Sequence, residues 1–337
     1  MRTETEEQQM NTNEYGIHTF SLKLQCKYSE IQNIIEQNEC ICTGKGKLRL
    51  SPYYQIPQFK DVGVEIQLGQ SVSHPCWLVL IVNPSSLFAG TYEPTTLFQA
   101  DEKSVQQIKH HLRNILDKIG VDRRLKEFKL SRCDLTCNLY YERKADVQDR
   151  LDIFKKSFPI PHYSAVKFGK HPNSDERFKG ANKHSWTITN KSKSCTFSAY
   201  DKTYELEKRH HIVINEHILR LELRFGRSKI IKITKVKDWE SQLIEFGSQV
   251  EKQQQKFLHR LHMMHFDPIP LPELLDRINS SKYREKTKKK LRRIVKKANG
   301  CVSLAAVQKD CRIRKSEFIK LLGKFEEMGI GCVSFKQ

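Results

Sequence analysis

Strict alternation of apolar and polar residues in three segments is the feature that most constrains the fold of this chain. Successive side chains of a β-strand point to opposite faces, so such alternation predicts half-buried strands. The pattern runs over residues 132–139, 194–202 and 219–225. The apolar face of the third segment consists of Leu219, Leu221, Leu223 and Phe225. We therefore expect three strands whose apolar faces cover a core.

The opposite faces of these strands carry the residue types of an active site. If the strands share a sheet, two carboxylates, a tyrosine and several cations lie together: Asp134, Glu222, Tyr200, Lys202, Arg132, Arg220 and Arg224. Carboxylate oxygens suit Mg²⁺ or Mn²⁺, which also bind phosphate oxygens. A metal-bound phosphate beside a tyrosine hydroxyl is the arrangement for a covalent phosphotyrosine intermediate. Alternation alone favours a simpler alternative, an antiparallel sheet with cross-strand ion pairs.

Composition narrows the class of protein. The chain has 337 residues, with 59 Lys and Arg against 39 Asp and Glu, a net charge of +20. This length predicts two or three domains. The longest apolar run, Trp77–Val82, has the length of a buried strand and not of a membrane span. Ten scattered cysteines predict free thiols, with a zinc site at Cys40 and Cys42 as a weaker alternative. We expect a soluble, intracellular protein that does not bind membranes.

Positive charge is concentrated near the C-terminus. The segment 281–297 holds ten Lys and Arg residues and a single acid, Glu285. A solvated helix usually mixes charges of both signs, so this self-repulsion favours a polyanionic partner, with a solubilising tail as the alternative. The candidate DNA contacts in this segment are Lys286, Lys288, Lys289, Lys290, Arg292 and Arg293.

Composition shifts divide the chain into four parts. We expect a disordered leader over 1–14, an α+β unit over 15–125 and a second α+β unit over 126–267. The run Pro268-x-Pro270-x-Pro272 breaks the chain and opens a basic unit over 268–337. Its expected order of helices and a final strand is that of a winged helix. Periodicity predicts helices over 29–37, 101–119, 147–158, 238–265, 272–278, 281–297, 302–310 and 314–328, and strands over 18–27, 62–68, 77–82, 128–141, 185–189, 195–200 and 217–225.

Three motifs resemble those of a known protein family. They are Arg132-x-Asp134-Leu-Thr-x-Asn138, Tyr200-Asp-Lys202-Thr-x-Glu205 and Leu219-Arg220-Leu-Glu222. Their order and spacing resemble the rolling-circle replication initiators of bacterial plasmids, filamentous-type phages and integrative elements, in the carboxylate-metal branch of the HUH-related endonucleases. The resemblance implies an α+β fold with an antiparallel nuclease sheet over 126–267, with a related half before it.

The resemblance also implies an activity. Such an enzyme nicks single-stranded origin DNA through a tyrosine that stays linked to the 5′ end. Tyr200 matches the nucleophile, Lys202 the residue that positions the phosphate or offsets tyrosinate charge, and Asp134 and Glu222 the ligands of Mg²⁺ or Mn²⁺. Arg132, Arg220 and Arg224 would contact DNA. The expected partners are origin DNA, a host helicase and a second copy of the chain in a dimer, in the bacterial cytoplasm.

Several alternatives remain open from the sequence. Many relatives bind metal through a His-hydrophobic-His motif, whereas this chain offers only the histidines at 110–111, 210–211 and 259–265. The competing nucleophiles are Tyr204 and, at the far end of the strand that carries Asp134, Tyr140 and Tyr141. A DNA-binding initiator or repressor without catalysis would need only the basic unit. A relaxase or transposase would share the chemistry, and an RNA-binding module is weaker because no RRM aromatic motif occurs.

Overall fold

The computed structural model describes residues 13–43, 53–71, 75–166 and 183–335. The fold is α+β, and ten strands of the described residues form one antiparallel sheet. The strand order is β2-β3-β4-β5-β1-β6-β10-β9-β8-β7. Most of the expected leader lies outside the described residues, and the first strand already begins at Glu14. Within the described residues, no helix has both the length and the apolar character required to span a bilayer.

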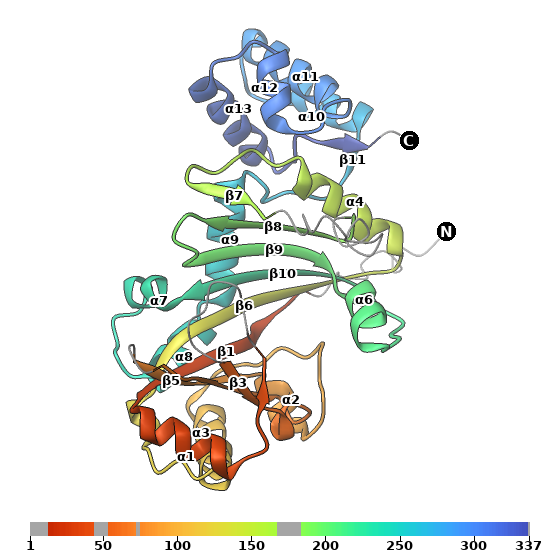
Figure 1. The fold of residues 1–337 in the computed structure, drawn as a ribbon. Helices are drawn as coiled ribbons and strands as arrows, with labels where there is room; N and C mark the ends of the chain where they lie inside the picture. The colour runs from red at the N-terminus through yellow and green to blue at the C-terminus, as the bar shows by residue number, and fades with distance from the viewer. Residues whose placement is uncertain (1–12, 44–52, 72–74, 167–182, 336–337) are drawn as a thin grey trace.

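The sheet consists of two halves with the same strand order. The first half contains β1 (Glu14–Cys26), α1 (Tyr28–Gln37), β2 (Ile41–Cys42), β3 (Tyr53–Ile56), β4 (Val64–Gly69), β5 (Cys76–Val82), α2 (Pro84–Ala89) and α3 (Glu102–Lys118). The second contains β6 (Lys129–Tyr141), α4 (Lys144–Lys155), β7 (Tyr163–Ala165), β8 (Ser185–Asn190), β9 (Cys195–Asp201), α6 (Lys202–Glu205) and β10 (His217–Gly226). In each half the first strand pairs with the last, and β1 pairs with β6 to join the halves at the centre of the sheet (Figure 1).

Helices pack on the apolar face that the alternation predicts. Phe197 of β9 contacts Phe154 of α4 and Phe257 of α9 (Val250–Leu261), with ring centroids 5.9 and 4.9 Å apart. Near the centre of the sheet, Trp239 of α8 (Trp239–Gly247) stacks on Phe20 of β1. Figure 1 shows α9 lying behind the strands of the second half. The helices therefore leave the polar side chains of β6, β9 and β10 on the opposite face.

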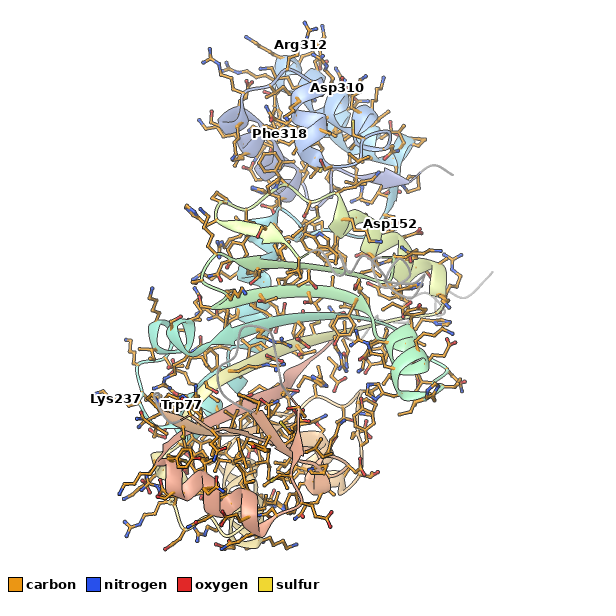
Figure 2. The ribbon with its side chains drawn as sticks, viewed as in Figure 1. Trp77, Asp152, Lys237, Asp310, Arg312 and Phe318 are labelled. Carbon is orange, nitrogen blue, oxygen red and sulfur yellow. The ribbon has the colours of Figure 1, made fainter. Side chains whose placement is uncertain are left out.

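The C-terminal unit has the helices that the sequence predicts. They are α10 (Leu271–Ser280), α11 (Glu285–Ala298), α12 (Leu304–Asp310) and α13 (Lys315–Glu327). The expected final strand is reduced to β12 (Ser334–Phe335), which pairs in parallel with β11 (Ile269–Pro270). Phe318 of α13 lies at the base of these helices, and its ring packs 5.4 Å from that of Phe158, next to the sheet domain (Figure 2).

The sequence-based expectation did not include β2, β3, α2 or β7, and it also differs from the structure at the ends of β9 and β10. The strand over 194–202 ends at Asp201, because the Asp201 carboxylate accepts a hydrogen bond from the backbone N–H of Tyr204 and caps α6. Lys202 therefore belongs to a helix and not to the sheet. In addition, the short helix α7 (Arg227–Ile233) follows β10, where no helix was expected.

Candidate functional site

The strand register places the predicted site residues on one face of the sheet. Arg220 of β10 lies between Tyr200 of β9 and Asn138 of β6. Two residues further along β10, Glu222 lies between Ser198 and Thr136. The next row pairs Arg224 with Asp134 and Thr196. The prediction that the polar residues of these three strands share a face is confirmed.

Asp134 is paired with two arginines. Its side chain is fully buried, and its carboxylate accepts hydrogen bonds from Nε of Arg132 at 2.8 Å and from Nε of Arg224 at 3.1 Å. Arg224 also donates from Nη2 to Oε1 of Glu222 at 2.9 Å. The guanidinium of Arg224 thus bridges the two predicted metal ligands. Cross-strand ion pairs, the simpler alternative for this face, are therefore present in the same place as the candidate site.

Glu222 lies beside the predicted nucleophile. The hydroxyl oxygen of Tyr200 is 3.4 Å from Oε2 of Glu222. Burial raises the pKa of Tyr200 well above its usual value near 10, and the charge of Glu222 raises it further. Burial, followed by the charge of Asp134, raises the pKa of Glu222 as well. The phenol is therefore protonated at neutral pH and donates to the carboxylate.

His18 is a site residue that the sequence analysis did not identify. Its Nδ1 lies 4.0 Å from Oε2 of Glu222. A bulge in β1 produces this position, because Ile17 pairs with Leu135 and Thr19 with Asp134, so His18 is an extra residue in the strand. Burial and the nearby charges of Arg220 and Lys202 hold the pKa of His18 well below its usual value, so the imidazole is neutral. The apolar residues at 17, 20, 22 and 24 indicate the bulge in the sequence, because the step from 17 to 20 breaks the interval of two residues.

Lys202 is buried and paired with a different carboxylate. Its Nζ donates to Oε2 of Glu205 at 2.6 Å within α6. Burial lowers the pKa of Lys202, the charge of Arg220 lowers it further, and the carboxylate of Glu205 opposes the shift. Among the described contacts, Lys202 pairs with Glu205 and not with Tyr200, so its expected role in offsetting charge on Tyr200 is not supported by a direct contact. Its role next to the phosphate stays a prediction.

Arg220 is fully buried and has one unused donor group. Its Nε donates to Oδ1 of Asn138 at 2.7 Å, and its Nη2 to the backbone oxygens of Pro94 and Thr95 at 2.9 and 3.1 Å. Nη1 is buried with no hydrogen-bond partner that meets the usual geometry among the described residues, and the guanidinium lies close enough to Tyr200 to oppose the rise in the pKa of its hydroxyl. An unpaired buried donor on a cation is costly unless a ligand satisfies it. The Arg220 side chain neighbours Tyr200 across the strands, so an anion in this place would complete its hydrogen bonding.

The competing nucleophile Tyr204 and the other histidines lie elsewhere. Tyr204 stacks on His184 with ring centroids 3.6 Å apart and lines a separate pocket with Asp201 and Glu207. His259 and His262 both lie near Glu326 of α13, at 3.8 and 3.6 Å. None of these groups lies among the residues that contact Glu222 in the described parts of the chain.

The basic helix α11 has two classes of cation. Lys290, Arg292 and Lys297 pair with the carboxylates of Glu317, Glu285 and Asp310, and Lys288 donates to the backbone oxygen of Asn279. The remaining cations are exposed and have no such partner among the described residues: Lys286, Lys289, Arg293 and Lys296. Their spacing of i, i+3, i+7 and i+10 places them on one side of the helix, within roughly an 80° arc. We call these four residues the α11 stripe.

The donors on the sheet face fit a magnesium-type cation in part. Among the described residues, no group of three or more His, Cys, Asp or Glu side chains has the arrangement of a metal site. Glu222 and His18 provide two neighbouring donors, and Mg²⁺ commonly uses one or two carboxylates with waters and substrate phosphates. Asp134 can add an oxygen only when it releases an arginine.

No protein-family model matches the chain, and the search of curated proteins found no match.

Proposed function

We propose that this protein is a metal-dependent, single-strand DNA endonuclease and strand transferase that initiates rolling-circle replication, with Tyr200 as its nucleophile. The contact between the Tyr200 hydroxyl and the Glu222 carboxylate carries the proposal. It joins a nucleophile to a proton acceptor inside a cluster of arginines that suits a phosphodiester. The motif resemblance and the basic C-terminal unit support the same reaction.

The chain's own residues account for the main requirements of the step. The Tyr200 oxygen attacks the scissile phosphorus, the bond from phosphorus to the 3′ oxygen breaks, and the 5′ end stays on the tyrosine. Glu222 takes the phenol proton, and a raised carboxyl pKa makes it a better base for this purpose. The unpaired Nη1 of Arg220 and the guanidinium of Arg224 bind the non-bridging phosphate oxygens.

The leaving 3′ oxygen takes a proton from solvent and becomes the primer terminus. A bound Mg²⁺ or Mn²⁺ would be held by Glu222 and His18 and would supply Lewis-acid polarisation of the scissile phosphate. A carboxylate has about four lone-pair positions, so Glu222 can accept from Tyr200 and from Arg224 and still offer a lone pair to a cation. The ion pair between Lys202 and Glu205 lies beside these residues, in α6.

A second function is favoured by a different observation, the α11 stripe. Four exposed cations on one side of a helix, with no carboxylate partner among the described residues, suit the phosphates of a duplex. The C-terminal unit would then act as a winged-helix-like domain that holds origin DNA, in a dimer and with a host helicase. On its own, this unit would make the protein a DNA-binding initiator or repressor. Relaxases and transposases use the same cleavage chemistry on other DNA.

The experiment that separates these functions uses strand cleavage. The full chain is incubated with Mn²⁺ and labelled single-stranded oligonucleotides that tile the DNA flanking its gene. We expect a labelled covalent adduct on a denaturing gel with the wild-type protein and none with Tyr200→Phe. Duplex binding without any adduct in either protein would leave the non-catalytic function in its place.

A further inference from the structure

A basic cleft lies on the helical side of the sheet, between α7 and α9. It has a volume of about 370 Å³, and its floor includes Leu223 and Phe225 of β10. Leu223 directly follows Glu222, and consecutive residues of a strand point to opposite faces. The cleft is therefore on the opposite face of the sheet from Tyr200 and Glu222.

Five cations line this cleft: Lys229, Lys232, Lys252, Lys256 and Arg260. Of the residues that the structure describes, none that lines the cleft carries a carboxylate. None of the five cations forms an ion pair with a carboxylate among the described residues. The acids nearest to these lysines along α8 and α9 accept hydrogen bonds from neutral amides, Glu245 from Gln249, which lines the cleft, and Glu251 from Gln255.

The geometry of the cleft suits a linear polyanion. Lys252, Lys256 and Arg260 follow each other at intervals of four residues along α9, a rise of about 6 Å per interval. Measured along the duplex axis, one strand of DNA advances about 3.4 Å per phosphate, so each interval equals the axial rise of roughly two phosphates. Arg260 is held in place over the rings of Tyr163 and Phe257, at 5.4 and 5.6 Å from their centroids.

The residues of the cleft do not favour contact with the bases of a nucleic acid. The aromatic rings that line the cleft, Phe225 and Phe257, are 2% and 3% exposed, so they cannot stack on unpaired bases. Lys232, Lys252 and Lys256 are exposed and reach solvent at the rim. Backbone contact without base readout is typical of duplex binding through charge.

We infer that the cleft between α7 and α9 binds the phosphate backbone of duplex DNA, on the side of the sheet opposite the cleavage site. The inference rests on the proposed function only in that the chain acts on DNA. Duplex in this cleft would run behind the sheet while a single strand reaches Tyr200 on the front. The cleft is separate from the α11 stripe of the C-terminal unit.

The test is a salt titration of duplex binding by two matched variants of the full chain. The cleft variant carries Lys229→Gln, Lys232→Gln, Lys252→Gln and Lys256→Gln. The control variant carries Lys60→Gln, Lys118→Gln, Lys126→Gln and Lys129→Gln, which are exposed lysines away from the cleft. Both lose four charges. The probe is a labelled 20-base-pair duplex, followed by fluorescence anisotropy.

We expect the cleft variant to bind at least about tenfold more weakly at 100 mM salt than the control, with a log–log salt slope reduced by roughly 0.9 per lost phosphate contact. Equal slopes in the two variants would overturn the inference. Preferential loss of binding to vesicles of phosphatidylserine and phosphatidylcholine, with duplex binding unchanged, would also overturn it in favour of a lipid surface. Adduct formation on single-stranded DNA, measured in parallel, tests cleavage by Tyr200. Failure of the proposed duplex site is therefore distinguishable from failure of the proposed cleavage function.

Discussion

The hydroxyl of Tyr200 lies 3.4 Å from Oε2 of Glu222, and this carboxylate oxygen lies 4.0 Å from Nδ1 of His18. Glu222 therefore contacts both the proposed nucleophile and a neutral imidazole. Its other oxygen accepts a hydrogen bond from Arg224, which also holds Asp134. This single carboxylate connects the nucleophile, a potential metal ligand and the arginine cluster, so its replacement is the most informative change after that of the tyrosine.

Replacing Glu222 with Gln should abolish most cleavage while the protein stays folded. The amide keeps the shape of the side chain but cannot accept the phenol proton, and general-base catalysis contributes about 10²–10⁴-fold to a rate. We expect the rate of adduct formation to fall by about that factor, measured with excess enzyme over labelled oligonucleotide. Cleavage at the wild-type rate in Glu222→Gln would remove Glu222 from the mechanism. Glu240→Gln, at a carboxylate of α8 that pairs with Lys109 outside this site, is the matched control and should cleave like the wild type.

Asp134→Asn should cost stability as well as activity. Although Asp134 lies on the polar face of β6, its carboxylate is fully buried and pairs with Arg132 and Arg224. Loss of its charge leaves Arg132 without a carboxylate partner and Arg224 with Glu222 alone. Because both guanidinium groups are partly exposed, we expect about 2 kcal/mol of destabilisation. Urea unfolding measures this cost, and an unchanged midpoint would contradict the ion-pair role.

The strands and helices with strong periodicity were predictable from the sequence. The helix expected over 101–119 is α3, and the strand expected over 217–225 is β10 within one residue. Polar residues of β6, β9 and β10 share a face because alternation determines it. Which carboxylate pairs with which arginine was not predictable, because this depends on register and side-chain conformation. His18 was missed because a bulge interrupts the alternation of β1, and Lys202 left the sheet because Asp201 caps a helix.

The α11 stripe should dominate DNA binding by the C-terminal unit. Lys286→Gln, Lys289→Gln, Arg293→Gln and Lys296→Gln together should weaken duplex binding and reduce the log–log salt slope by about 0.9 per lost phosphate contact. The control removes the same charge from the engaged cations, through Lys288→Gln, Lys290→Gln, Arg292→Gln and Lys297→Gln. Equal loss in both variants would show that net charge, and not the stripe, determines the affinity.

His262 should make the protein less stable at acidic pH. Burial lowers the pKa of His262 below its usual value near 6.5, and the carboxylate of Glu326 only partly opposes this shift. Below about pH 6.5 the unfolded chain therefore binds a proton that the folded chain resists, so the free energy of unfolding falls as pH falls. Urea unfolding at pH 7.5 and 5.5 measures the difference.

His262→Asn should reduce this pH dependence in part, because burial also lowers the pKa of His18 and of His184, which contribute in the same direction. Asn suits the position because His262 has a backbone φ of 54°, in the left-handed region that Asn tolerates. His265→Asn, at an exposed histidine nearby, should behave like the wild type. A pH dependence that is the same in all three proteins would assign it to other groups.

Chelation should stop cleavage and leave duplex binding in place. If a divalent cation is held by Glu222 and His18, EDTA should prevent adduct formation, and added Mn²⁺ should restore it. His18→Gln should raise the Mn²⁺ concentration needed for half-maximal cleavage, because one of the two donors loses its imidazole. Cleavage that persists in EDTA would show that no cation is required.

The most direct test of the central claim is peptide mapping of the covalent adduct. The wild-type adduct formed with single-stranded DNA is digested with protease and nuclease, and the modified peptide is identified by mass spectrometry. We predict a 5′-linked phosphodiester on Tyr200, an adduct of the same kind in Tyr204→Phe, and none in Tyr200→Phe, whose stability should change by about 1 kcal/mol or less. A modification mapped to Tyr204 or another residue, or an adduct that persists in Tyr200→Phe, would contradict the account.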